Sequence, residues 1–265
     1  MRTDVVLTRY KGLANTTKAL PLLINKPKIT ILFVAASPKG LDPVQYDGVL
    51  QALQELTQQQ NLEGRIEVKT LITPYEEYHE EQFQRSATEQ EFVSMLREHN
   101  PDIVHFIGHG RYTPEGGELA FADMNNEPDW LHESRLANWL GQHHSVRLVF
   151  LQACETAPSQ SQNPHVISGV AYSLAKLNIP AIIAMKYSVD NHSSNVFAKH
   201  FYGSLARGRD VDAAVQEGRE QVVLKFNDNR SYAFGLPTLY LRDSGGLLAP
   251  VTDLRVVKNR KKKKA

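Results

Sequence analysis

Two short motifs in this chain contain side chains that together could perform nucleophilic chemistry. The first, His-Phe-Ile-Gly-His-Gly, spans residues 105–110, and the second, Leu-Gln-Ala-Cys-Glu-Thr-Ala, spans residues 151–157. An imidazole next to a thiol acts as its base, because it accepts the proton as the sulfur attacks an electrophilic carbon. His109 and Cys154 are therefore the candidate base and nucleophile. They lie far apart in the sequence, so the fold must bring them together.

Attack of a thiolate on a carbonyl group produces an oxyanion, which needs hydrogen-bond donors that are already in place. Gly110 follows the candidate base, and the absence of a Cβ lets its backbone N–H approach a substrate closely. The backbone N–H of Cys154 is the natural second donor. We therefore expect Gly110 and Cys154 to form the oxyanion hole.

Alternating strands and helices are predicted to position these residues. Continuous apolar runs predict strands, at 28–36, 65–72, 102–107, 147–153, 179–185 and 238–241. Apolar residues at helical spacing predict helices around 49–56, 92–96, 191–206 and 210–224. Such alternation gives a mostly parallel sheet with helices on both faces, and ligands of these sheets bind beyond the carboxyl ends of the strands. His109 and Cys154 follow the third and fourth of these strands, and a turn there would expose both side chains at this edge.

Two segments depart from the alternation. Residues 111–130 contain Gly116-Gly117 and Asn125-Asn126, which predict a hairpin inserted after the third strand. The first 27 residues are weakly patterned, with one short strand at 5–7. We divide the chain into a lead-in (1–27), one α/β domain (28–245) and a basic tail (246–265).

Composition narrows the class of protein. The chain of 265 residues has a formal net charge of +1, but six basic residues lie within its last eight positions. The remainder has 24 basic and 29 acidic residues, so the body lacks the positive charge of a nucleic-acid binder. No apolar run is long enough to span a membrane. The single cysteine excludes an internal disulfide and favours a reducing, cytoplasmic location.

Neither a cofactor nor a metal is expected. The Gly108–Gly110 segment lacks the lysine and the spacing of a phosphate-binding loop. A strand end separates His105 from His109, and the adjacent pair His143 and His144 has no cysteine pair nearby, so the histidine spacing does not indicate zinc.

The order of these motifs resembles the CHAT domain, a caspase-like (clan CD) family related to separases and metacaspases. The resemblance rests on both paired motifs, and further matches lie at 184–190, 211–214 and 234–240. It covers residues 28–242. It implies a caspase-like three-layer α/β sandwich and a cysteine endopeptidase, a thiol protease in which His109 is the base and Cys154 the nucleophile.

The resemblance also implies a protein or peptide substrate, a regulatory protein partner and a place in a bacterial signalling or defence system. Asp190 follows the fifth strand, where relatives form the pocket for the residue before the scissile bond. It is the candidate floor of a pocket for a basic side chain, or alternatively the N-cap of the next helix. Two other functions stay open: a catalytically inactive CHAT-like interaction module, and a cysteine amidase for small molecules.

Overall fold

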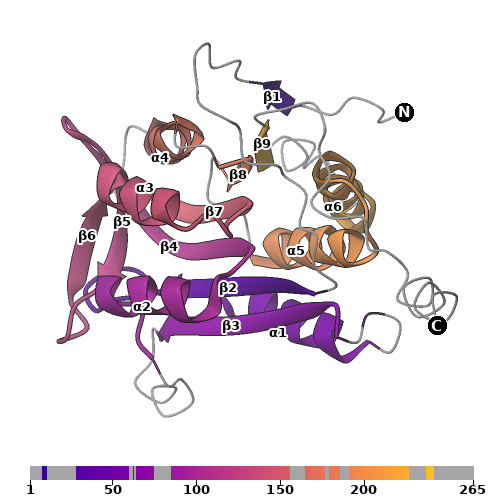
Figure 1. Ribbon diagram of the computed structural model, residues 1–265, viewed down its shortest axis with the longest axis horizontal. Coiled ribbons are helices and arrows are strands. Elements are labelled where there is room, and N and C mark those ends of the chain that lie inside the picture. The colour runs from indigo at the N-terminus through magenta and orange to yellow at the C-terminus, as the bar shows by residue number, and fades with distance from the viewer. Residues whose placement is uncertain are drawn as a thin grey trace, which may run out of the picture.

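The fold is described from a computed structural model, which covers residues 8–10, 28–59, 62, 64–74, 85–155, 165–176, 179–185, 191–226 and 237–241. Strands and helices alternate along most of the chain (Figure 1). The strands are β1 (Thr8–Tyr10), β2 (Ile29–Ala36), β3 (Ile66–Thr73), β4 (Ile103–Thr113), β5 (Gly116–Ala122), β6 (Pro128–His132), β7 (Leu148–Glu155), β8 (Ala181–Met185) and β9 (Pro237–Leu241). The helices are α1 (Asp47–Gln58), α2 (Glu89–His99), α3 (Glu133–Gln142), α4 (His165–Lys176), α5 (Asn191–Ala206) and α6 (Val211–Phe226).

One sheet organises the molecule, with the strand order β1-β9-β8-β7-β4-β2-β3. The strands β3, β2, β4, β7 and β8 pair in parallel, whereas β9 pairs antiparallel with β8. All eight residues of β2 are buried, as expected for a parallel strand covered on both faces. The predicted mostly parallel α/β sandwich is therefore confirmed.

The molecule has three layers, a central sheet and a layer of helices on each face, and an apolar core lies on each side of the sheet. Helices α1, α5 and α6 pack on one face of the sheet, and helices α2, α3 and α4 pack on the other (Figure 1). The strands supply alternate residues to the two cores, because successive side chains point to opposite faces. In β4, Ile103 and Ile107 belong to the α1/α5/α6 core, and Val104 and Phe106 belong to the α2/α3/α4 core.

The third predicted strand is longer than expected. No turn follows Ile107; β4 continues through Gly108, His109 and Gly110 to Thr113. The continuation is stabilised by β5, which pairs antiparallel with the last four residues of β4, while β6 pairs with β5. The predicted hairpin after the third strand is therefore present, but His109 lies within a strand.

The helix boundaries follow local signals. The Thr88 hydroxyl accepts a hydrogen bond from the Glu91 N–H (3.2 Å) at the start of α2, and Asn100 ends that helix in a left-handed conformation, with φ of 44°. The prediction for α5 matches its observed bounds, and α6 begins immediately after Asp210. Helix α4 was not among the predicted elements. The strand predicted at 5–7 lies outside the described residues, whereas β1 begins at Thr8 and pairs with β9.

Candidate active site

The candidate base and nucleophile lie on neighbouring parallel strands in direct register. The Cα of His109 in β4 pairs with the Cα of Cys154 in β7. Neighbouring strands are about 4.8 Å apart, so the two backbones are separated by one strand spacing. Alternation along β4 places His109 on the sheet face covered by α1, α5 and α6, the face of Ile103 and Ile107. The fold therefore brings together the two residues that sequence reasoning selected.

His109 is held by a backbone group from another part of the chain. Its Nε2 lies 2.7 Å from the carbonyl oxygen of Asp42, in the segment between β2 and α1. A carbonyl oxygen only accepts hydrogen bonds, so Nε2 must carry the proton and donate it. In this tautomer Nδ1 has the free lone pair. Nδ1 is buried and has no hydrogen-bond partner among the described residues, which leaves it able to accept a proton.

The surroundings of His109 favour its neutral form. The side chain is only 4% exposed, and this burial lowers the pKa of His109, although the hydrogen bond and charge of Asp42 oppose the shift. A neutral imidazole with a free Nδ1 is the form that a general base requires. In this form the imidazole can accept a proton from a neighbouring group at neutral pH.

This pKa shift predicts the acidic limit of thiol reactivity. Because the pKa of His109 is lowered, the imidazole becomes protonated only below pH 6.5, and the base is lost as the pH falls through the shifted pKa. We expect the rate of Cys154 alkylation by iodoacetamide to fall with a midpoint below pH 6.5. Alkylation rates measured from pH 4 to 9 check this, with His109→Asn as the variant that should lack the transition. A midpoint above pH 6.5 would contradict the assignment.

The structure gives less information about the other predicted site residues, Gly110, Cys154 and Asp190. Gly110 pairs with Leu119 of β5 on one side and with Glu155 of β7 on the other, so its N–H lies in the plane of the sheet. The structure describes the backbone of Cys154, within β7. Asp190 lies outside the described residues.

Sequence reasoning missed the Asp42 carbonyl group. A backbone oxygen has no residue-type signature, and the contact joins positions 67 residues apart. One local signal was present: Pro43 follows Asp42, and a residue before proline is restricted to extended conformations. That restriction helps to fix the direction of the Asp42 carbonyl.

A second histidine of the first motif lies on the same face, beneath the site. His105 is completely buried and stacks on Phe150 of β7, with 4.2 Å between ring centroids. Its Nδ1 forms a hydrogen bond with the hydroxyl of Tyr202 in α5 (2.9 Å). Burial lowers the pKa of His105 to about 3, and the Gln152 side chain opposes the shift. His105 is therefore a neutral core residue at physiological pH.

Metal-binding clusters and membrane-spanning helices are both absent from the described part of the chain. There, no group of three or more histidine, cysteine, aspartate and glutamate side chains is placed to bind a metal ion. In the same residues, no helix has both the length and the apolar character needed to cross a bilayer.

Comparisons with known proteins agree with the fold. A family model described as the CHAT domain matches residues 3–239. The chain resembles the structure of the Arg-specific cysteine proteinase gingipain R, with a TM-score of 0.52 and 11% identity, covering 84% of this chain and 48% of that one. It also resembles a chain of the Saccharomyces cerevisiae separase–securin complex, with a TM-score of 0.44 and 13% identity, covering 82% of this chain and 12% of the other. No curated protein is significantly similar in sequence.

These comparisons define the extent of the likeness. The chain spans about half of the gingipain chain and a small part of the separase–securin chain. At these identities the likeness concerns the fold, which is caspase-like.

Proposed function

Because the chain belongs to the CHAT domain family and has a caspase-like fold, we propose that it is a cysteine endopeptidase that cleaves a protein partner. The observation that supports this most directly is the register of His109 with Cys154, together with the Asp42 carbonyl that selects the Nε2–H tautomer. In this tautomer the buried Nδ1 of His109 keeps its lone pair free among the described residues. A base for a neighbouring thiol needs that lone pair.

The proposed reaction uses these groups in sequence. Nδ1 of His109 accepts the thiol proton as the sulfur of Cys154 attacks the scissile carbonyl carbon, and the imidazolium then donates that proton to the departing amine. Water hydrolyses the resulting thioester with His109 again as the base. The N–H groups of Cys154 and Gly110 are the proposed oxyanion donors. Gly110 has ladder partners on both sides.

The decisive experiment is labelling with an electrophilic peptide probe, followed by mass mapping of the modified residue. The endopeptidase proposal predicts covalent modification of Cys154 that is blocked by a cleavable peptide. A catalytically inactive interaction module would show no labelling above that of an unfolded control. An amidase for small molecules would react with small thiol reagents and reject the peptide probe.

Substrate preference provides a separate prediction, based on Asp190. A positively charged side chain loses hydration when it enters a pocket, and a carboxylate there compensates for the loss. We expect cleavage after Arg or Lys in a peptide library, with this preference lost in Asp190→Ala. If Asp190 instead caps α5, the unmutated protein will favour an uncharged residue. An unchanged preference for Arg and Lys in the variant would also show that Asp190 does not set specificity.

A further inference from the structure

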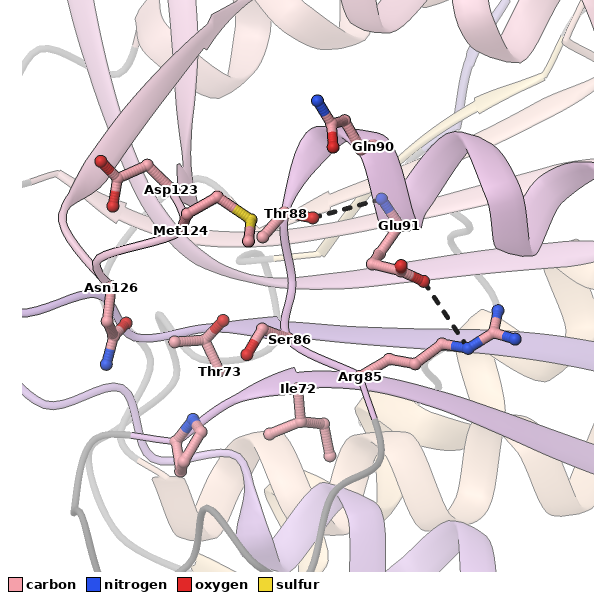
Figure 2. A pocket seen from close by; sticks show the side chains of 11 residues that line it. Ile72, Thr73, Arg85, Ser86, Thr88, Gln90, Glu91, Asp123, Met124 and Asn126 are labelled. Atoms are coloured by element: carbon pink, nitrogen blue, oxygen red, sulfur yellow. Dashed lines mark hydrogen bonds and ion pairs between the residues drawn. The ribbon is translucent and has the colours of Figure 1, made fainter.

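A polar cavity opens at the carboxyl edge of the sheet. Its volume is about 570 Å³, and its walls come from the end of β3, the start of α2 and the turn between β5 and β6 (Figure 2). Hydroxyl and amide groups of Thr73, Ser86, Thr88 and Asn126 line it, with Ile72 among its apolar members. The catalytic proposal uses none of these residues.

The cavity is linked to the candidate active site by one loop. The N–H of Lys39 donates a hydrogen bond to the carbonyl oxygen of Asn126 (2.7 Å), so the β2–α1 segment contacts the β5–β6 turn. The same segment contains Asp42, which holds His109. In the sheet, β4 and β2 lie between β7 and β3, so the end of β3 is three strand spacings, about 14 Å, from the strand that contains Cys154. An extended substrate covers that distance in about four residues.

One atom of the cavity wall lacks a partner. The Oδ1 of Asn126 is buried and accepts no hydrogen bond from the described residues. A buried acceptor without a donor is costly, and Asn126 is one of the residues that line the cavity. Figure 2 shows the Asn126, Thr73 and Ser86 side chains along one side of the cavity, with the Met124 thioether opposite. An N–H donor from a ligand would satisfy the Asn126 oxygen once the side-chain amide turns toward the cavity.

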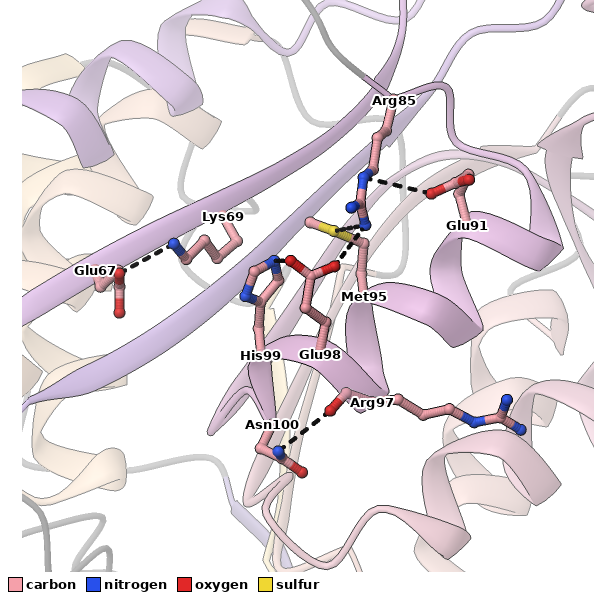
Figure 3. Close-up of polar contacts among 9 residues, drawn as sticks. All are labelled: Glu67, Lys69, Arg85, Glu91, Met95, Arg97, Glu98, His99 and Asn100. Carbon is pink, nitrogen blue, oxygen red and sulfur yellow. Dashed lines mark hydrogen bonds and ion pairs between the residues drawn. The ribbon is translucent and has the colours of Figure 1, made fainter.

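The charges around the cavity favour a cation. Of the ionisable side chains that line it, Glu91 and Asp123 are acidic and Arg85 is basic. Arg85 is already engaged by Glu91 (3.6 Å) and by Glu98 (2.9 Å), as Figure 3 shows. The backbone N–H groups of Asn125 and Glu127 donate to the Asp123 carboxylate and lower its pKa, so Asp123 stays charged. The part of the cavity wall that the structure describes is therefore net negative.

We infer that this cavity binds a lysine or arginine side chain of the protein substrate, about four residues from the scissile bond. The inference rests on the proposed endopeptidase function. A basic side chain supplies the N–H donor for Asn126, adds positive charge to a negative wall, and can lay its methylene groups against Ile72 and Met124. A glutamate side chain would instead oppose the Asn126 oxygen and the Asp123 carboxylate.

The test uses a peptide library with lysine, norleucine or glutamate at each position within four residues of the cleaved bond. At one position we expect kcat/KM to favour lysine over norleucine about tenfold, the size of one charge-assisted hydrogen bond. Asn126→Gly keeps the left-handed backbone (φ 62°) and removes the acceptor, so the preference should collapse. Asp123→Asn should weaken the lysine preference, because it removes a negative charge from the cavity wall. The turn should keep its shape, because an amide oxygen can still accept the two backbone N–H groups.

Glu127→Gln is the matched control, because it removes one charge from the same turn at an exposed residue outside the cavity. It should leave the lysine preference unchanged. A lysine preference that persists in Asn126→Gly, or that falls equally in Glu127→Gln, would overturn the inference, as would equal rates for lysine and norleucine at every position.

Binding separates this inference from the proposed function. Dissociation constants of the same peptides are measured by fluorescence anisotropy on Cys154→Ala protein. One outcome is that the unmutated protein cleaves no peptide, while lysine peptides bind about tenfold more tightly than norleucine peptides and lose this advantage in Asn126→Gly. In that case the endopeptidase proposal fails and the basic-residue site stands. Cleavage without any lysine advantage in rate or binding would leave the endopeptidase proposal standing and overturn the basic-residue site.

Discussion

Replacement of Cys154 by alanine is expected to abolish peptide-bond cleavage, with a loss of about 10⁴-fold or more in kcat. The reason is that the residues of a nucleophile–base pair act as a unit, so removal of either member removes nearly the whole contribution of the pair. His109→Ala should therefore cause a loss of similar size, and the double variant should be scarcely worse than either single one. Cleavage of a fluorogenic peptide measures all three.

Two controls make this result interpretable. His144→Ala removes an exposed histidine elsewhere on the surface and should retain full activity. Circular dichroism and the midpoint of urea unfolding should show that the Cys154 and His109 variants remain folded. Retained cleavage in Cys154→Ala would end the dyad proposal, whatever the effect of His109→Ala.

The parts of the fold that sequence reasoning predicted well are those whose patterns are local. The strand at β2 is a continuous apolar run, and the structure buries every residue of it. The bounds of α5 agree with the prediction, and α2 ends at Asn100, before Pro101, as its turn signal indicates. The order of strands and crossovers then places His109 and Cys154 at one edge, because all the strands concerned run in parallel.

The parts that were missed depend on partners elsewhere in the chain. Gly108 and Gly110 look like strand breakers in the sequence, yet β4 passes through them because β5 returns to pair with its end. The Asp42 carbonyl became part of the site through the path of a loop, which no residue type reveals. Helix α4 had a readable signal, since Val170, Ala171 and Leu174 recur at helical spacing and are buried.

The aromatic cluster beneath the site explains why the first motif contains two histidines with different roles. His105 lies among Phe33, Phe150 and Tyr202, and its buried ring stays neutral. His109 lies two positions beyond Ile107 on the same face, past the end of the pairing with β2, where the Asp42 carbonyl sets its tautomer. Sequence spacing alone could not assign these roles, because both histidines follow apolar residues on one strand.

Acid is expected to destabilise the folded protein through His105. Its pKa is 6.5 in the unfolded chain and about 3 in the folded state, so below pH 6.5 the unfolded state binds a proton that the folded state does not. The stabilisation is complete above pH 6.5 and is lost progressively toward pH 3. At about 1.4 kcal/mol per pH unit, the free energy of unfolding should fall by roughly 5 kcal/mol from this residue.

The double variant His105→Phe/Tyr202→Phe isolates this contribution. It removes both partners of a buried hydrogen bond and keeps the aromatic packing on Phe150, so its stability at pH 7 should be close to that of the unmutated protein. The single variant His105→Phe leaves the Tyr202 hydroxyl buried and should be less stable by about 1–3 kcal/mol. Urea unfolding from pH 7 to pH 3 measures the difference.

Burial also lowers the pKa of His109, His143 and His200, but these residues contribute equally to both proteins. Parallel loss of stability in the double variant and the unmutated protein would show that His105 is not the acid-sensitive group.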